Sequence, residues 1–245
     1  MKNILKIKFD NTIYLFLLLI ILCGMFKEFS FIFILLFFHE LGHAIIGLIL
    51  RWKLISITFY PYGGLTLFNK EENSSINEEI LILLAGPIFQ IITYLVLDYY
   101  FKYDYIKTYH LTILIFNLLP IYTLDGGRLL NLLLNKVFNY LKSFYITIII
   151  SFITIFLLIL FCVFKYHNFN LMLLSIFLIF KVIKSIKDIK YRYNKFLVER
   201  YLNDYTIKKT KVSKNLYSFY KEYYHYIDFK EEKVYLNKYF YFKDK

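Results

Sequence analysis

FIFILLFFHELGHAIIGLIL, residues 31–50, is an apolar run that contains two histidines and a glutamate. Its length matches the roughly 20 residues that a helix needs to cross the hydrocarbon core of a bilayer. Ionisable side chains at that depth are costly and usually serve a function. We therefore interpret His39, Glu40 and His43 as candidate functional residues within a membrane-spanning helix.

The composition of the 245-residue chain favours a membrane protein. Hydrophobic residues make up 59% of the sequence, whereas typical soluble domains contain about 45–50%. The net charge of +12 is interpreted as a lysine-rich surface beside an anionic lipid leaflet, and we expect no nucleic-acid partner.

Apolar runs predict an all-α polytopic membrane protein with about six transmembrane helices. The runs cover residues 12–26, 29–50, 80–97, 109–124, 144–164 and 169–183. Lysine and arginine are concentrated before the first run, after the second and after the fourth, so the positive-inside rule places both termini in the cytoplasm. The predicted membrane core is residues 1–183, and residues 184–245 form a small basic cytoplasmic C-terminal tail.

Two further segments are not expected to be simple spans. Residues 54–68 alternate β-branched and aromatic side chains around Pro61 and a Gly-Gly pair, which predicts a short re-entrant β-hairpin or loop. Residues 126–142 carry leucines at helical spacing, which predicts an amphipathic helix on the cytoplasmic surface.

The five residues HELGH place three polar groups on adjoining faces of a helix. At about 100° per residue, His39 and His43 lie one turn apart on one face and Glu40 lies beside them. This spacing allows two imidazoles to bind Zn²⁺ while a glutamate removes a proton from water. Gly42 and Ala44 leave room for another segment or a substrate to approach.

A catalytic zinc site needs a third protein ligand. His110 and His167 are expected at the outer membrane edge and His225 in the tail, so an acidic residue is the better candidate. NLLPIYTLDGGRLL, residues 117–130, places Asp125 at the cytoplasmic end of the fourth run, after Pro120, which should break the helix. Two carboxylates and two neutral imidazoles would bring a Zn²⁺ site to zero formal charge, which lowers the cost of burial.

HELGH on the second run, AGP at residues 85–87 on the third and N-x-x-P-x-x-x-L-D-G-G at residues 117–127 together resemble the site-two protease family of intramembrane zinc metalloproteases. The resemblance covers roughly residues 30–130. It implies that His39, His43 and Asp125 hold one zinc ion and that Glu40 is the general base.

NLLP, PYGG and FLVERY are similar to the sporulation members of that family, which process the precursor of the sigma factor sigma-K. This implies a multi-pass protein of the bacterial cell membrane that cleaves a membrane-associated protein substrate under the control of inhibitory membrane partners. Gln90 stands where many relatives carry asparagine, so the resemblance does not say whether it contacts substrate.

Two other interpretations remain open. The protein could be a related protease that acts on another membrane substrate, such as an anti-sigma factor. It could also be a non-enzymatic metal-binding scaffold or a permease, since transporters also carry broken spans with intramembrane polar residues. Glu40 favours hydrolysis, because a transport site has no clear need for a base beside two metal ligands.

Overall fold

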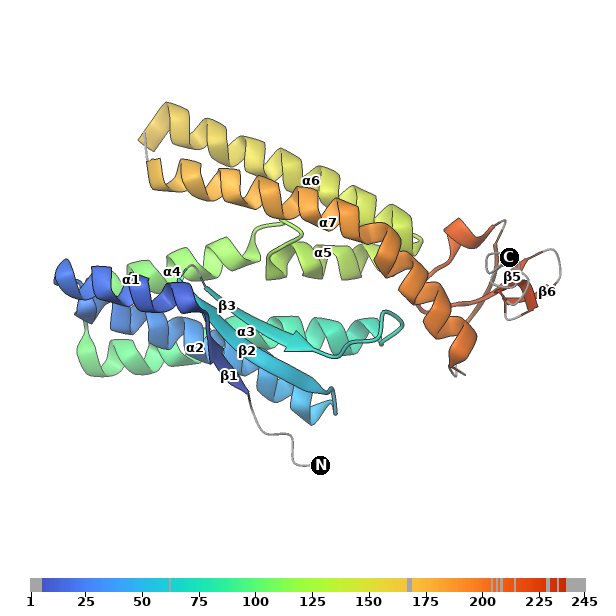
Figure 1. The fold of residues 1–245 in the computed structure, drawn as a ribbon, viewed down its shortest axis with the longest axis horizontal. Helices are drawn as coiled ribbons and strands as arrows, with labels where there is room; N and C mark the ends of the chain where they lie inside the picture. The colour runs from blue at the N-terminus through green and yellow to red at the C-terminus, as the bar shows by residue number, and fades with distance from the viewer. Residues whose placement is uncertain are drawn as a thin grey trace. The chain divides into compact units, whose positions relative to one another are not determined.

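The fold is described from a computed structural model (Figure 1). The chain forms two compact units. The first unit comprises Met1–Lys70 and Asn77–Asn117, and the second comprises Glu71–Ile76 and Leu118–Lys245. The structure describes residues 6–61, 63–166, 169–203, 205, 207, 209–213, 215–227, 230–232 and 234–236.

The first unit combines four helices with a small sheet (Figure 1). Its elements in chain order are β1 (Ile7–Phe9), α1 (Asn11–Leu22), α2 (Phe26–Ile49), β2 (Leu54–Tyr60), β3 (Gly63–Phe68), α3 (Ile76–Phe101) and α4 (Asp104–Leu118).

The hairpin predicted for residues 54–68 is confirmed, because β2 and β3 pair in antiparallel register. Tyr60 pairs with Gly63 at the turn and Thr58 with Leu65 further along. The sheet order is β1-β2-β3, and β1 pairs with β2 in parallel, which the sequence analysis did not predict. Among the described strands β3 pairs only with β2, so its other side is an edge of the sheet.

Helices α2 and α3 approach closely at a small residue of the HELGH segment. A Cβ atom on Gly42 would lie 2.6 Å from the carbonyl oxygen of Ala85 on α3. Glycine therefore permits backbone contact between the two helices, a common way to pack membrane helices. Ala44, which is fully buried, lies in a hydrophobic cluster with Ile57 and Phe59 of β2. The space expected beside these two small residues is thus filled by other segments of the chain.

The second unit contains long helices and a second small sheet (Figure 1). Its elements are α5 (Asp125–Asn135), α6 (Tyr140–Phe161), a π-helical turn (Cys162–Tyr166), α7 (Phe169–Leu202), β4 (Thr210–Val212), a 3₁₀ turn (Leu216–Ser218), β5 (Tyr224–Ile227) and β6 (Lys230–Glu231). Helix α7 runs continuously across residue 184, where the sequence predicts the tail to begin.

The single helix predicted over residues 126–142 is wrong in its extent. Helix α5 ends at Asn135, and α6 begins at Tyr140. The Asn139 side chain caps α6 by accepting a hydrogen bond of 2.8 Å from the backbone N–H of Lys142. Asparagine is a strong N-cap residue, so it starts a new helix within a run whose leucine spacing suggests one.

Pro120 ends α4 as predicted, and a side chain of α6 binds the backbone that follows. Helix α4 stops at Leu118. The Ser151 hydroxyl accepts a 2.9 Å hydrogen bond from the N–H of Tyr122 and lies 3.4 Å from the carbonyl oxygen of Pro120. Non-helical backbone at membrane depth needs such internal partners.

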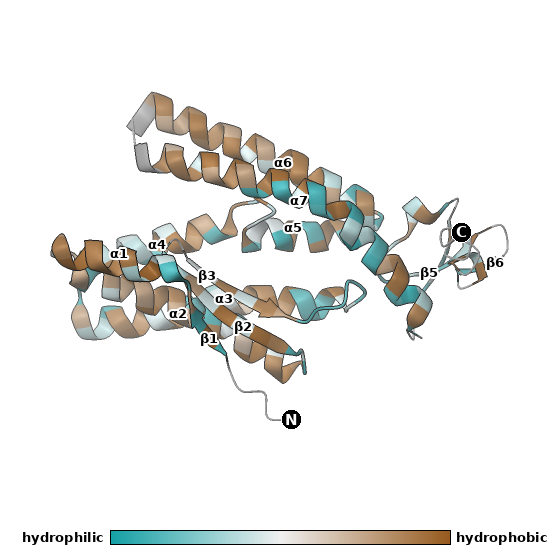
Figure 2. Cartoon of the chain, in the orientation of Figure 1, coloured by the Kyte–Doolittle hydropathy of each residue, from teal (hydrophilic) through white to brown (hydrophobic). Residues whose placement is uncertain are grey.

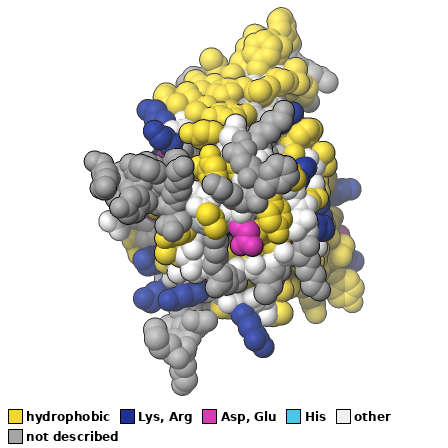
Figure 3. Space-filling view, turned by 90° about the vertical axis from the view of Figure 1, so that its right-hand side faces the viewer, with side chains coloured by type: hydrophobic (Ala, Val, Ile, Leu, Met, Phe, Trp, Pro, Cys, Tyr) yellow, Lys and Arg dark blue, Asp and Glu magenta, His cyan; other side chains and the backbone are white. Residues whose placement is uncertain are grey.

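Three helices in the described part of the chain are long and apolar enough to cross a membrane. They are Phe26–Ile49, Ile76–Phe101 and Tyr140–Phe164, and Asn11–Leu22 is a shorter apolar helix. Figure 2 shows α6 as almost uniformly hydrophobic, whereas α7 changes to hydrophilic toward its C-terminal end. Figure 3 shows hydrophobic side chains gathered in the upper part of that view, with lysine and arginine at the borders. The count of six spans and the cytoplasmic termini remain predictions.

The C-terminal region has its own core. Phe196, Phe219, Ile227 and Leu236 are fully buried in one hydrophobic cluster. Residues 237–245 of the predicted tail lie outside the described residues.

The polar centre of this region is Arg200. Its guanidinium contacts Glu232 at 3.0 Å and donates to the carbonyl oxygen of Tyr223 at 2.7 Å. It also donates to the Asn73 side chain at 2.7 Å, which ties the short Glu71–Ile76 segment to α7. Arg200 belongs to the FLVERY stretch, so this stretch anchors the C-terminal region.

Candidate metal centre

His39 and His43 bring two ring nitrogens together on one side of α2. Their Nε2 atoms are 3.2 Å apart, and the rings meet edge to face with centroids separated by 4.9 Å. Their relative exposures are 2% and 6%. The predicted placement of the two imidazoles one helical turn apart on one face of the helix is confirmed.

The other ring nitrogen of each histidine faces a hydrogen-bond acceptor. Nδ1 of His39 lies 3.0 Å from Oε1 of Gln90, and Nδ1 of His43 lies 2.7 Å from the carbonyl oxygen of Ile82. A neutral imidazole that donates from Nδ1 carries its lone pair on Nε2. In that tautomer both Nε2 atoms, 3.2 Å apart, could act as ligands of one cation.

The spacing of these nitrogens fits a zinc site. Two Zn–N bonds of about 2.0–2.1 Å at a tetrahedral angle place the nitrogens about 3.3 Å apart. Gly86 of α3 keeps the adjoining space open, because a Cβ atom there would lie 2.3 Å from Nε2 of His43 and 2.9 Å from Nε2 of His39. Gly86 belongs to the AGP motif, which gives that motif a steric role.

Glu40 is buried against β3, the edge strand of the hairpin. Its Oε2 accepts a 2.7 Å hydrogen bond from the hydroxyl of Thr66. A Cβ atom on Gly64 would lie 2.2 Å from Cγ of Glu40. Sequence reasoning missed the role of both β3 residues, although the glycine pair marked the hairpin.

Asp125 is the first residue of α5, in the second unit, and is partly buried. A carboxylate in the first turn of a helix is stabilised by the helix dipole. Neither following glycine could carry a side chain, since a Cβ atom on Gly126 would lie 2.1 Å from the carbonyl oxygen of Leu118 and one on Gly127 at 2.1 Å from that of Ile121. Close backbone packing thus requires the two glycines after Asp125, and the ligand role of Asp125 stays a prediction.

The remaining described histidines have other partners. His110 of α4 lies beside Gln90. His225 of β5 lies 3.2 Å from Glu232, and burial lowers the pKa of its imidazole, an effect that Glu232 only partly offsets. The sequence analysis placed neither residue among the ligands.

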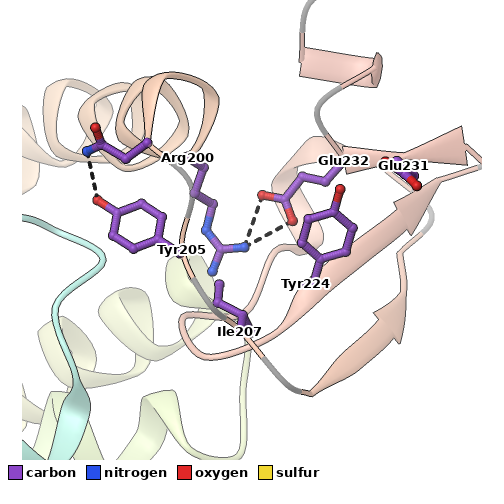
Figure 4. A pocket seen from close by; sticks show the side chains of 7 residues that line it. Arg200, Tyr205, Ile207, Tyr224, Glu231 and Glu232 are labelled. Atoms are coloured by element: carbon purple, nitrogen blue, oxygen red, sulfur yellow. Dashed lines mark hydrogen bonds and ion pairs between the residues drawn. The ribbon is translucent and has the colours of Figure 1, made fainter.

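A concave site of about 230 Å³ lies in the C-terminal region. Figure 4 shows the paired Arg200 and Glu232 beside it. Its lining residues are Arg200, Asn203, Tyr205, Ile207, Tyr224, Glu231 and Glu232. Arg200 is hydrogen-bonded to other groups of the protein, so we interpret its role at this site as stabilising the fold.

Known proteins that resemble this chain include a peptidase family and zinc metalloproteases, which agrees with a metal centre at His39 and His43. The model of peptidase family M50 matches residues 28–110 and 103–161, which together are more than half of the chain. Stage IV sporulation protein FB of Bacillus subtilis is 30% identical over 148 residues, which cover 57% of this chain and 51% of that protein. A zinc metalloprotease of Methanocaldococcus jannaschii is 32% identical over 157 residues, covering 57% of this chain and 45% of the relative.

The solved site-2 protease of Methanocaldococcus jannaschii matches with a TM-score of 0.55 and 28% identity, covering 74% of this chain and 91% of that one. The chain spans about half the length of the curated relatives named above. The resemblance to site-two proteases is confirmed by these matches. The chain therefore belongs to peptidase family M50.

Proposed function

We propose that the protein is an intramembrane zinc metalloprotease that hydrolyses a peptide bond in a membrane-associated protein. The observation that carries this proposal is the pair of buried Nε2 atoms 3.2 Å apart, with Glu40 next to them on the same helix. Family membership and the zinc metalloproteases among the relatives support the same reading.

One zinc ion would be held by His39, His43 and Asp125. The two histidines lie together on α2, and the family resemblance supplies Asp125 as the third ligand. When bound, zinc supplies a Lewis acid that polarises the scissile carbonyl and lowers the pKa of a water toward about 7. Three protein ligands leave the fourth position open, as catalytic zinc sites require.

Glu40 would act as the general base. Its carboxylate removes a proton from the attacking water and later delivers that proton to the leaving amine nitrogen. The Thr66 hydroxyl holds Oε2, which fixes the direction of the carboxylate. Burial against β3 also keeps bulk water away from this side of Glu40.

The substrate segment would bind as an added strand on β3. A protease must extend its substrate to expose the scissile carbonyl, and an edge strand offers free backbone groups for this. β3 has such an edge within the described sheet, and its Thr66 contacts the proposed base. A strand paired there would lie about 4.8 Å away.

Cysteine cross-linking tests the added strand. With Cys23 replaced by serine, a cysteine at Leu67, which is 41% exposed, would be paired with single cysteines along an uncleaved substrate. Cross-linking that alternates with a two-residue period supports strand addition. A helical period, or the same yield at every position, contradicts it.

The proposed substrate is the pro-sequence of the sporulation sigma factor sigma-K. The similarity to stage IV sporulation protein FB supports this choice. We further propose a bacterial cell-membrane protein with six spans and both termini in the cytoplasm, acting with inhibitory membrane partners. An anti-sigma factor or another membrane protein is the second candidate substrate. Membership of peptidase family M50 alone supports this alternative, which does not depend on the similarity to the sporulation members.

Co-expression tests the proposed reaction. Wild type and Glu40→Gln would each be produced with the sigma-factor precursor, and the shortened product followed by immunoblot. We expect product only with wild type, and equal zinc content in the two purified proteins. Proteolysis by Glu40→Gln would rule out the proposed base, whereas a wild type that binds zinc but yields no shortened product would favour a non-enzymatic metal-binding protein.

A further inference from the structure

Gln90 is a fully buried amide at the centre of three helices of the first unit. It lies on α3, and its Oε1 is 3.0 Å from Nδ1 of His39 on α2. On its other side, Nε2 donates a 3.1 Å hydrogen bond to the backbone carbonyl of His110 on α4. An amide buried in an apolar environment is tolerated when both of its ends have partners.

The direction of the amide follows from its two neighbours. The carbonyl oxygen of His110 can only accept, so it must face the NH₂ group of Gln90. The amide oxygen is then the atom that faces His39, and it can only accept a proton held on Nδ1. Reversing the amide would bring oxygen against oxygen at the 3.1 Å contact.

The partner at the far end is itself held in place. The His110 ring stacks on Tyr94, with ring centroids 4.3 Å apart and planes inclined by 9°. Tyr94 follows Gln90 on α3 by one helical turn, so the same helix supports both ends of this arrangement. The chain of contacts thus runs from α2 through Gln90 to a fixed point on α4.

The two histidines of the HELGH segment differ in how they are held. Nδ1 of His43 bonds to the backbone carbonyl of Ile82, which no side-chain substitution removes. Nδ1 of His39 bonds to a side chain. His39 is therefore the ring whose orientation depends on a replaceable residue.

We propose that Gln90 is a positioning residue that holds His39 with its proton on Nδ1 and its Nε2 lone pair directed toward His43. This inference rests on the proposed function, because it assigns Gln90 a role in zinc binding. Groups that bond the distal nitrogen of a ligating histidine fix its tautomer and ring orientation, and their loss typically lowers metal affinity by about 10–100-fold. On this reading Gln90 does not contact substrate.

The test is zinc affinity, measured by chelator competition on purified full-length protein in detergent. Gln90→Leu should weaken binding about 10–100-fold. Gln90→Glu should weaken binding less than Gln90→Leu, because a carboxylate still accepts from Nδ1–H although its second oxygen would face the carbonyl oxygen of His110. The matched control is Thr93→Val on the same helix, where the lost hydroxyl bonds only to the carbonyl of Phe89; its affinity should be unchanged.

Thermal unfolding of the zinc-free proteins separates positioning from a purely structural cross-link. A structural cross-link would lower the unfolding temperature of zinc-free Gln90→Leu and leave zinc affinity unchanged, which would overturn the proposal. Gln90→Asn is a second variant, one methylene shorter, and should weaken zinc binding even if Gln90→Leu does not fold. Wild-type affinity in Gln90→Asn would also overturn it.

Cobalt substitution and turnover supply further readouts. The visible Co²⁺ spectrum should change in Gln90→Leu and not in Thr93→Val, and added zinc should restore kcat with little change in KM. A raised KM that zinc does not correct would instead indicate a substrate contact and contradict the inference.

If wild type itself binds no zinc, the proposed function fails, whereas zinc binding by wild type and by Gln90→Leu with equal affinity refutes only the role of Gln90.

Discussion

The Thr66 hydroxyl donates a 2.7 Å hydrogen bond to Oε2 of Glu40 and also lies 3.2 Å from the carbonyl oxygen of Glu40. This pair joins the edge strand β3 to the helix that carries HELGH. The same strand that could receive a substrate therefore also holds the proposed base.

Thr66→Val should lower kcat by about 10–100-fold, because a hydrogen bond to a charged group is worth about 1.5–3 kcal/mol. Valine keeps the size and the strand preference of threonine, so zinc content should not change. Initial rates on the cleaved substrate measure the effect. Thr58→Val on β2 is the matched control, and a similar loss there would mean that the hairpin, not the bond to Glu40, is responsible.

Gly86→Ala should abolish tight zinc binding. Its Cβ atom would lie 2.3 Å from Nε2 of His43, so the ring must leave the position that faces His39. Zinc content after purification and chelator competition measure the loss, which should exceed tenfold. Ile88→Ala, an exposed position two residues along α3, should bind zinc like wild type; normal binding by Gly86→Ala would show that the ring has room to move.

Much of the metal centre could be predicted from local sequence. Helical periodicity places His39, Glu40 and His43 on one side of α2, and the rigid ring of Pro120 ends α4 where expected. These outcomes depend on backbone geometry that a few neighbouring residues determine. The ligand role of Asp125 was likewise inferred from sequence and remains to be tested.

Other features depend on contacts between distant segments, which local patterns do not encode. The partners of Gln90 on α2 and α4 are far from it in sequence. Strand β1 has only three residues and forms by pairing with β2, so it shows no periodicity of its own. The hydrogen bonds of Arg200 in the C-terminal region join residues beside β5 and β6 to the Glu71–Ile76 segment.

Ser151→Ala should destabilise the turn that leads to Asp125. The substitution leaves the buried N–H of Tyr122 without its hydroxyl acceptor, which costs about 1–3 kcal/mol. We expect a fall of several degrees in the thermal unfolding temperature and a lower zinc content. Thr154→Val on α6 is the control, since its hydroxyl bonds only to the carbonyl of Ile150 in its own helix. If Ser151→Ala and Thr154→Val lowered the unfolding temperature and the zinc content equally, the hydrogen bond from Tyr122 to Ser151 would not be the cause.

The C-terminal region should lose stability as the pH falls. Burial opposes ionisation of Glu232, but the hydrogen bond from His225 and the charge of Arg200 outweigh it and lower the pKa of its carboxyl below 4.5. Burial lowers the pKa of His225 below 6.5, with Arg200 and Lys211 adding to the effect and Glu232 opposing it. In both cases the unfolded chain binds more protons than the folded chain, so protonation favours unfolding.

The loss should begin near pH 6.5, as His225 of the unfolded chain becomes protonated, and continue below pH 4.5 through Glu232. Limited proteolysis of the C-terminal region, with a protease active across this range, measures the onset. Glu232→Gln should make the region more sensitive at pH 7, because buried Arg200 loses its charged partner, and should flatten the dependence below pH 4.5. A cleavage rate that stays constant from pH 7 to pH 4 would show that this cluster does not control the stability of the region.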